Sequence, residues 1–233
     1  YWLNISDMVN YTKRVGGFLA TNLSTNGDVA NLDCILGSDL DDLIISIDGI
    51  TKEVYESNRP GVSRFDTFER TWERVHEFLE HKAGYGSKPF VRLQIINMHN
   101  TAAQIVPFVE HFINTPGVDD CFVKNLDAMA PWLGDAVVSE EESRIKMELV
   151  KDTPCSHLWS ILAVAASGQY LACCHDAKSE LTAALPDGRF PHIRNTSIAE
   201  WWGGPFMTKL RQEHAAHSFR MPCAQCHERD CWL

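Results

Sequence analysis

Apolar residues in the first half of the chain alternate between strand-like runs and helix-like periodicity. The run 43–48 is apolar almost to its end, which is typical of a parallel strand covered by helices on one side. The segment 65–79 places aromatic and aliphatic residues at helical spacing in a charged background. In chain order, the pattern predicts helix 6–15, strand 18–23, helix 28–36, strand 43–48, helix 65–79, strand 90–96, helix 102–114 and strand 121–126. Such alternation predicts an α/β fold with a mainly parallel sheet or barrel.

The pattern changes after Pro131. An acidic stretch, 139–148, is typical of a solvated connector, so we expect one domain over 1–138 and a second over 139–233. In the second domain, 158–164 and 169–173 predict a β-hairpin with Gly168 at its turn. Ser197 and Glu200 form a capping box that opens a helix, and the Gly-Gly-Pro sequence at 203–205 predicts that this helix is interrupted.

Composition narrows the class of protein further. The 233 residues include 21 basic and 31 acidic side chains, a formal net charge of −10, which disfavours nucleic-acid or anionic membrane surfaces as partners. The apolar stretches are much shorter than the roughly 20 residues of a membrane span. With no export signal visible, we expect a soluble cytoplasmic protein. Its eight cysteines therefore favour metal ligation or redox chemistry over a disulfide framework.

Four cysteines form the sharpest feature of the sequence. Cys155 and Cys173 would lie at the open ends of the predicted hairpin, and Cys223 and Cys226 have the two-residue separation that directs both thiolates at one metal. A set of four thiolates suits tetrahedral zinc or a cubane iron–sulfur cluster. The spacing alone does not separate these two ligands, and ordinary buried thiols are the structural alternative.

The remaining cysteines carry less information. Cys34 and Cys121 have apolar neighbours in predicted regular structure, which favours core packing. Cys174 follows a candidate ligand and would point to the opposite face of a strand. Cys231 is a further ligand, a substitute for Cys226, or idle.

Two groups of motifs resemble one known family. The segment 45–51, together with Thr25-Asn26-Gly27, resembles the middle of the radical S-adenosylmethionine (SAM) barrel. The tail resembles the SPASM or twitch domain that follows this barrel in many such enzymes. Its matching motifs are Cys-x12-Gly-x4-Cys, the segment 197–202, Leu210-Arg211, His214 and Cys-x2-Cys.

The resemblance implies a partial (β/α)6 barrel, strands 3 to 6, followed by a small domain built from a β-hairpin and a helix. The family's Cys-x3-Cys-x2-Cys loop, which holds the catalytic [4Fe–4S] cluster, does not occur in this sequence. We therefore expect a fragment that lacks the first two strand–helix units and is inactive alone, in preference to a degenerate member that lost the loop. The catalytic cluster would come with the missing part.

The resemblance also implies a cofactor site. Ser46 and Arg59 would contact SAM, whose cleavage gives a 5′-deoxyadenosyl radical, and Asn26 and Asp48 would face the same cavity. Turn chemistry at Asn26 and Asp48 and a surface ion pair at Arg59 are the structural alternatives. Polar residues between Gln94 and Asn100 would line a substrate cavity or cap the next helix. No catalytic acid or base can be named.

For the tail, the resemblance implies one auxiliary [4Fe–4S] cluster on Cys155, Cys173, Cys223 and Cys226. It further implies an electron donor such as flavodoxin or ferredoxin and a substrate that is a peptide, a protein or a small molecule. The full-length protein would be a radical SAM oxidoreductase or maturase. A zinc-stabilised binding or scaffold module on a degenerate barrel is the alternative from another class.

Overall fold

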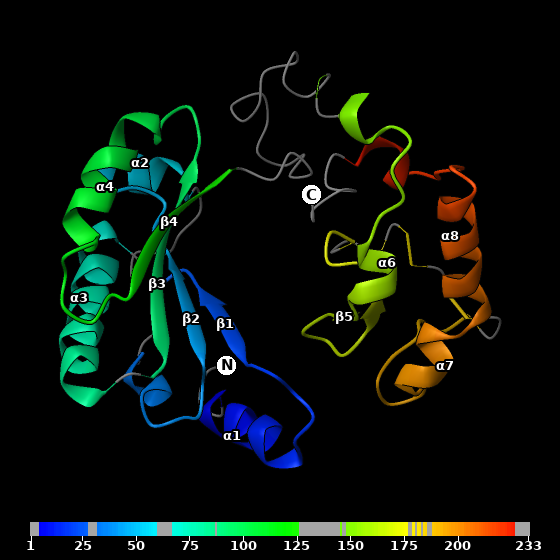
Figure 1. Ribbon diagram of the computed structural model, residues 1–233, viewed down its shortest axis with the longest axis horizontal. Helices are drawn as coiled ribbons and strands as arrows, with labels where there is room; N and C mark the ends of the chain where they lie inside the picture. Colours follow the sequence, from blue (N-terminus) through cyan, green and yellow to red (C-terminus); the bar gives the residue numbers. More distant parts are fainter. Residues whose placement is uncertain are drawn as a thin grey trace. The chain divides into compact units, whose positions relative to one another are not determined.

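The computed structural model describes residues 5–27, 32–59, 67–86, 88–125, 145, 148–176, 179, 181–182, 184–185 and 188–226. The chain divides into two compact units, residues 1–126 and 127–233, which are described separately below (Figure 1). The predicted boundary at 138/139 falls between 126 and 144, outside the described residues, and stays a prediction.

A parallel sheet forms the centre of the N-terminal unit. Its strands are β1 (Asn22–Thr25), β2 (Asp42–Ser46), β3 (Phe90–Asn97) and β4 (Asp120–Asn125), and their spatial order follows the sequence. All three neighbouring pairs are parallel, with Ser46 opposite Gln94 in the register of β2 and β3. The carboxyl ends of the four strands therefore meet at one edge.

Helices α2 (Lys52–Ser57), α3 (Phe68–Tyr85) and α4 (Ile105–Phe112) lie on one face of the sheet (Figure 1). Strand residues that alternate along β2 and β3 are buried against them, because side chains of a strand point in turn to the two faces. The resulting core contains Leu43, Ile45, Val91, Leu93, Ile95, Val75, Phe78, Leu79, Phe108 and Phe112. On the opposite face, Ile44, Ser46, Arg92 and Gln94 are half-buried.

Most elements predicted for this unit are confirmed, with four corrections. The first strand begins at Asn22, not at residue 18, and Leu19 is fully exposed. Helix α1 (Ile5–Val15) buries Val9 but leaves Met8 and Tyr11 exposed, since its apolar stripe is narrow. In the described part of the predicted helix 28–36, only a 3-10 turn, η1 (Asp33–Ile35), is present. The predicted helix 102–114 begins as a 3-10 turn, η2 (Ala102–Gln104), and continues as α4.

The C-terminal unit is built from short elements. They are α6 (His157–Ser160), β5 (Ala163–Val164), β6 (Tyr170–Leu171), α7 (Ile198–Trp202), α8 (Pro205–Ala215) and the 3-10 turn η4 (Cys223–Gln225). Strands β5 and β6 form an antiparallel hairpin whose turn contains Gly168 at a φ of 93°. The hairpin is thus confirmed, but both arms are shorter than predicted: 157–160 is helical, and the second strand is limited to Tyr170–Leu171.

Both predictions about the last helices are confirmed. The Ser197 hydroxyl accepts a hydrogen bond from the backbone N–H of Glu200 (3.2 Å), and the backbone N–H of Ser197 donates to the Glu200 carboxylate (2.7 Å). Helix α7 ends before Gly203, and Pro205 begins α8. The proline supplies no backbone donor, which a first helical position does not need.

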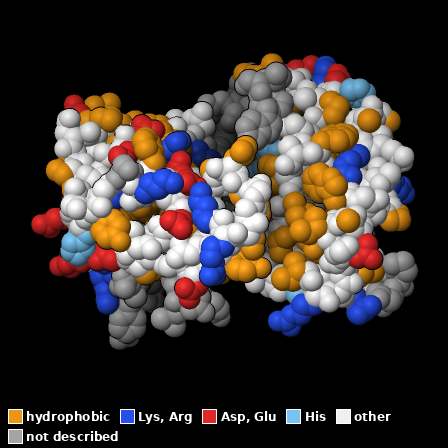
Figure 2. Space-filling view, turned by 60° about the horizontal axis from the view of Figure 1, so that its bottom comes forward, with side chains coloured by type: hydrophobic (Ala, Val, Ile, Leu, Met, Phe, Trp, Pro, Cys, Tyr) orange, Lys and Arg blue, Asp and Glu red, His pale blue; other side chains and the backbone are white. Residues whose placement is uncertain are grey.

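The surface of the C-terminal unit is rich in hydrophobic side chains (Figure 2). Exposed members include Trp159, Leu162, Val164, Phe190, Ile193 and Ile198. Within the part of the chain that the structure describes, no helix has both the length and the apolar character that crossing a membrane requires.

Candidate metal centre

The segment that carries Cys155 is fixed to helix α8. The buried backbone N–H of Cys155 donates to Nδ1 of His214 (3.2 Å). One turn earlier on α8, Arg211 donates from Nε to the carbonyl of Leu158 (2.7 Å) and from Nη1 to the carbonyl of Trp202 (2.6 Å). Residues three apart on a helix share a face, so α8 holds both ends of the 155–158 segment. Two side chains of one helix therefore set the position of the first cysteine.

Cys173 follows β6 on the other arm of the hairpin. The pKa of its thiol is raised to about 12, mainly by burial and in smaller part by the thiols of Cys174, Cys223 and Cys155, against a lowering contribution from the backbone N–H of His175. Burial at this position therefore favours the neutral thiol as long as no cation is bound. The thiolate form of such a buried cysteine becomes favourable only when a cation is bound beside it.

The segment carrying Cys223 and Cys226 is also attached to α8. Arg220 makes a two-pronged ion pair with Glu213, in which Nε and Oε2 are 2.6 Å apart and Nη2 bonds Oε1. The backbone N–H of Ala224 donates to the carbonyl of Arg220 (2.9 Å), and that of Cys226 donates to Cys223 (3.1 Å). Both cysteines are buried. A fixed turn thus presents the Cys-x2-Cys pair at the end of α8.

The four thiols fit a cluster or a metal ion by their chemistry and surroundings. Cys155 and Cys223 belong to the apolar core of this unit, which also contains Leu158, Tyr170, Ala172, Leu181, Trp201, Met207 and Leu210. Cys226 is equally buried, and Cys173 is partly buried. Soft thiolate donors shielded from water are the ligands that zinc and iron–sulfur clusters use. The four-cysteine assignment stays a prediction supported by this arrangement.

The other cysteines are placed as follows. Cys34 and Cys121 pack partly buried against the core of the N-terminal unit, as predicted, and burial raises the pKa of Cys121 to about 11. Cys174 is exposed, with its sulfur 3.7 Å from Nδ1 of His157. Cys231 lies outside the described residues.

The four residues predicted to bind SAM lie near the carboxyl ends of β1 and β2. Arg59 donates from Nε to the Asp48 carboxylate (2.7 Å) and from Nη2 to the carbonyl of Asn26 (3.4 Å). Its guanidinium lies over the Tyr55 ring, 4.7 Å from the centroid. Ser46 accepts from Nε2 of Gln94 on the adjacent strand (3.0 Å). Arg59, Asp48 and Asn26 thus form one connected group, and their role in binding SAM stays a prediction.

Sequence reasoning did not find several residues that organise these sites. Arg211 and His214 were noted as family motifs, but their contacts with the 155–158 segment were not foreseen. Their three-residue spacing on a helix was an available signal. The Arg220–Glu213 pair joins residues on either side of a helix end, and nothing in the sequence indicates that they meet. Helix α2 was also missed, because Tyr55 is its one buried residue.

Comparison with known families identifies the C-terminal unit. Residues 155–231, about a third of the chain, match the family model of SPASM, an iron–sulfur cluster-binding domain. The matched range begins at Cys155 and includes Cys173, Cys223 and Cys226. This part of the chain is therefore similar to SPASM domains, in agreement with the resemblance seen in the sequence, and the match supports a SPASM-containing protein of the radical SAM type. No curated protein matches the chain.

Proposed function

We propose that this chain is the larger part of a radical SAM oxidoreductase or maturase whose SPASM domain holds one auxiliary [4Fe–4S] cluster on Cys155, Cys173, Cys223 and Cys226. The observation that carries the proposal is the SPASM match over all four cysteines, of which Cys155, Cys223 and Cys226 are buried. A cluster with four protein thiolates has no open iron, so it would supply electron transfer or structural support.

The protein's own residues prepare this site before the cluster binds. His214 fixes the backbone just before α6 and Arg211 fixes it within α6, while the Arg220–Glu213 pair fixes the turn that contains Cys223. Leu158, Met207 and Leu210 exclude water from one side. Because ligand positions are set by α8, a change in α8 contacts should alter cluster occupancy without touching a thiol.

The architecture of the N-terminal unit supports a barrel. A doubly wound sheet has helices on both faces, whereas a barrel has them outside only. Here the described helices α2, α3 and α4 cover one face of a parallel sheet, and half-buried polar residues such as Arg92, Ser46 and Gln94 lie on the other. The strand order follows the sequence, as in a barrel. These strands would be the third to sixth of a radical SAM (β/α)6 barrel.

In this proposal, SAM binds at the carboxyl ends of the strands. With SAM and a catalytic cluster bound, the chemistry supplied is reductive cleavage of SAM to a carbon radical that takes a hydrogen atom from the substrate. Ser46 would contact the cofactor through its hydroxyl, and Arg59 would contact a carboxylate. Asp48 and Asn26 hold the Arg59 guanidinium in place through the bonds described above, so their first role is to orient it.

The partners belong to the proposal as well. Electrons would come from a flavodoxin or ferredoxin, and the protein would act in the cytoplasm. The substrate would be a peptide, a protein or a small molecule, with no nucleic acid or membrane surface involved. The surplus of acidic residues disfavours a strongly anionic substrate.

Anaerobic reconstitution of the full chain with iron and sulfide tests the cluster. We expect the broad visible absorbance of a [4Fe–4S] cluster and, after reduction, its electron paramagnetic resonance signal. Cys121→Ala is the matched control, because Cys121 is a partly buried thiol of the other unit. A preparation that takes up one zinc ion and no iron would sink the proposal in favour of a zinc-stabilised module.

The proposed radical chemistry is tested first by the coding sequence of the gene and then by an activity assay. We expect its coding sequence to specify a Cys-x3-Cys-x2-Cys loop ahead of Tyr1, and the reduced protein containing that loop to convert SAM to 5′-deoxyadenosine. A continuous coding region without the loop would exclude this part of the proposal and leave a cluster-binding module.

A further inference from the structure

Three side chains with metal-ligand atoms lie together outside the four-cysteine set. They are His157 at the start of α6, and Cys174 and His175 after β6. One ligand atom from each lies within 4.8 Å of the other two. The Cys174 sulfur is 3.7 Å from Nδ1 of His157, and the two imidazole rings are stacked with an interplanar angle of 6°. Among the described residues, no other set of three side chains drawn from histidine, cysteine, aspartate and glutamate has its ligand atoms this close together.

The sulfur-to-nitrogen distance suits tetrahedral zinc, whereas one of the two stacked imidazole rings has to rotate, because a metal ion lies in the plane of each imidazole that binds it. Bond lengths of about 2.3 Å to sulfur and about 2.1 Å to nitrogen at a tetrahedral angle place the sulfur and nitrogen ligands roughly 3.6 Å apart. The separation of 3.7 Å between Cys174 Sγ and His157 Nδ1 is close to that value. The two atoms therefore need little movement to share one ion.

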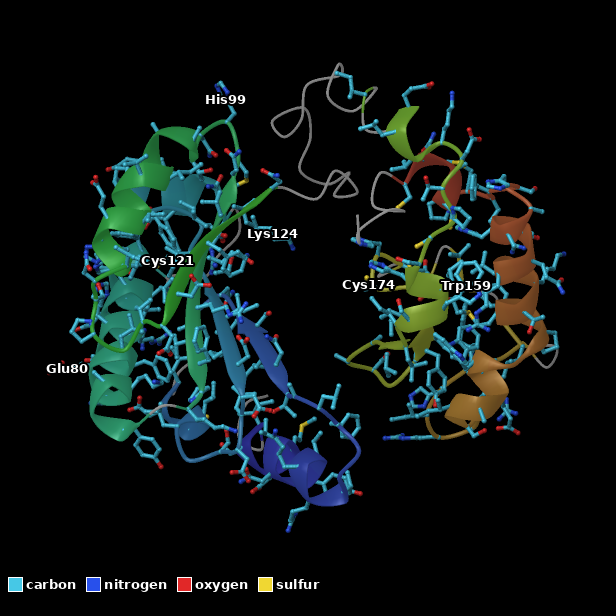
Figure 3. The ribbon with its side chains drawn as sticks, in the orientation of Figure 1. Glu80, His99, Cys121, Lys124, Trp159 and Cys174 are labelled. Atoms are coloured by element: carbon cyan, nitrogen blue, oxygen red, sulfur yellow. The ribbon has the colours of Figure 1, made fainter. Side chains whose placement is uncertain are left out.

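These three side chains come from the same two segments as Cys155 and Cys173. His157 is two residues after Cys155, and Cys174 and His175 directly follow Cys173, so the same two segments supply both groups. Cys155 is buried in the apolar core, whereas Cys174 is exposed beside α6 (Figure 3). In the second group, Cys174 is exposed and His175 is half-buried, so an ion can enter from their side, whereas His157 is buried behind them.

We propose that His157, Cys174 and His175 bind a zinc ion that is separate from the iron–sulfur cluster. One thiolate and two neutral imidazoles form a borderline-soft donor set that zinc accepts, and three protein ligands leave the fourth position open to water or to a substrate atom. On binding, Cys174 becomes a thiolate and its proton passes to solvent. The site goes beyond the proposed function and does not rest on it.

The ion would have a structural consequence. His157 belongs to the segment before the hairpin and Cys174 to the segment after it, so zinc would join these two segments on the solvent side. The four-cysteine set would join the same segments on the core side. A zinc ion with an open position next to an electron-carrying cluster could also polarise a substrate carbonyl close to a redox centre.

X-ray absorption at the zinc edge tests the site in the full chain after anaerobic cluster reconstitution and addition of Zn²⁺. We expect one retained zinc ion per chain with one sulfur and two nitrogen ligands from the protein. Cys174→Ser should lower zinc affinity at least tenfold and leave iron content unchanged, because Cys174 is exposed and its loss leaves the core intact. His175→Gln should behave in the same way, and Cys121→Ser should keep both metals.

Three results would overturn the proposal. The first is that the chain retains no zinc. The second is a zinc ion with sulfur ligands alone that is lost in Cys223→Ser but kept in Cys174→Ser. The third is a loss of iron in Cys174→Ser while zinc is unaffected. The last result would make Cys174 a cluster ligand. Since the test reads the sulfur-to-nitrogen ratio at zinc, its outcome is separate from whether the four cysteines take iron.

Discussion

The two units of this chain reach stability by different routes. The N-terminal unit buries a continuous core between a four-stranded parallel sheet and its helices. The C-terminal unit has strands of two residues each and a small core in which Cys155 and Cys223 are members. Two-stranded hairpins of this size are marginal without further support. The first unit is therefore organised by apolar packing, and we expect the second to depend on what its thiols bind.

This difference matters because metal binding and local folding are coupled wherever the ligands come from distant segments. Helix α8 holds the segments of Cys155 and Cys223, and the segment of Cys173 is joined to that of Cys155 by a hairpin with strands of two residues. Removing the bound group should release these segments, whereas the sheet of the N-terminal unit contains no element that depends on it. Each prediction below is a way to break or to sharpen this contrast.

The largest effect is expected from Cys223→Ala. We expect loss of nearly all cluster iron and of the melting transition of the C-terminal unit, with the transition of the N-terminal unit unchanged. Iron content and calorimetry of the reconstituted chain provide the measurement. Cys121→Ala, the matched control, should keep its iron. If iron content and both transitions survived in Cys223→Ala, the ligand assignment would be wrong.

We expect a smaller loss of iron and of stability when the contacts between α8 and the 155–158 segment are removed. Arg211→Met removes two charged hydrogen bonds to the carbonyls of Leu158 and Trp202, each of which contributes about 1.5–3 kcal/mol in comparable cases. We expect lower thermal stability of the C-terminal unit and reduced iron occupancy. Lys209→Met, at an exposed position of the same helix, is the control and should change stability by less than about 0.5 kcal/mol. Equal effects of the two changes would remove Arg211 from this role.

Alanine substitutions at two glycines of the C-terminal unit distinguish the cost of backbone strain from the cost of a steric clash. Gly168 has a φ of 93°, and a Cβ there would lie 2.7 Å from Cε1 of His192. Gly188 has a φ of 81° with nothing within 4 Å. Alanine at either position costs about 1–2 kcal/mol for the left-handed backbone. Urea unfolding should show a larger loss for Gly168→Ala, and a loss no larger than that of Gly188→Ala would refute the contact.

The smallest effect concerns pH and the N-terminal unit. Hydrogen bonds from Lys13 and Lys88 hold the pKa of Asp41 well below its usual range. A lowered folded-state pKa stabilises the protein at pH values above about 3.9, the unfolded value, and the stabilisation is lost as pH falls through the folded pKa. Asp41→Asn should therefore lower stability at neutral pH, and its difference from the parent chain should shrink in acid. A difference independent of pH would show that charge is not involved.

Much of this molecule follows from local sequence patterns. The apolar run 43–48, the strand pattern of 90–96 and the helical periodicity of 65–79 predicted two strands of the sheet and its main helix, because packing there agrees with local preference. The Ser197 capping box and the break before Pro205 were equally readable. These features depend on residues close together in the chain.

Other features depend on contacts that local sequence does not encode. Residues 157–160 form a helical turn where a strand was predicted, and Arg211 donates to the carbonyl of Leu158 at the heart of that turn. The cysteine spacing indicated a metal site, yet the approach of His157 to Cys174 depends on how the hairpin closes. Residue types gave the chemistry of the sites, and tertiary contacts decided which residues meet.

Hydrogen–deuterium exchange of the full chain, compared with its cluster loaded and after the cluster is removed, tests the central contrast most directly. We expect amide protection to fall over the hairpin, α6 and the Cys223–Cys226 turn when the cluster is removed. Protection of β2, β3 and α3 should stay unchanged. Equal protection of the C-terminal unit in the two states would contradict the account, because that unit would then fold without the group its cysteines bind.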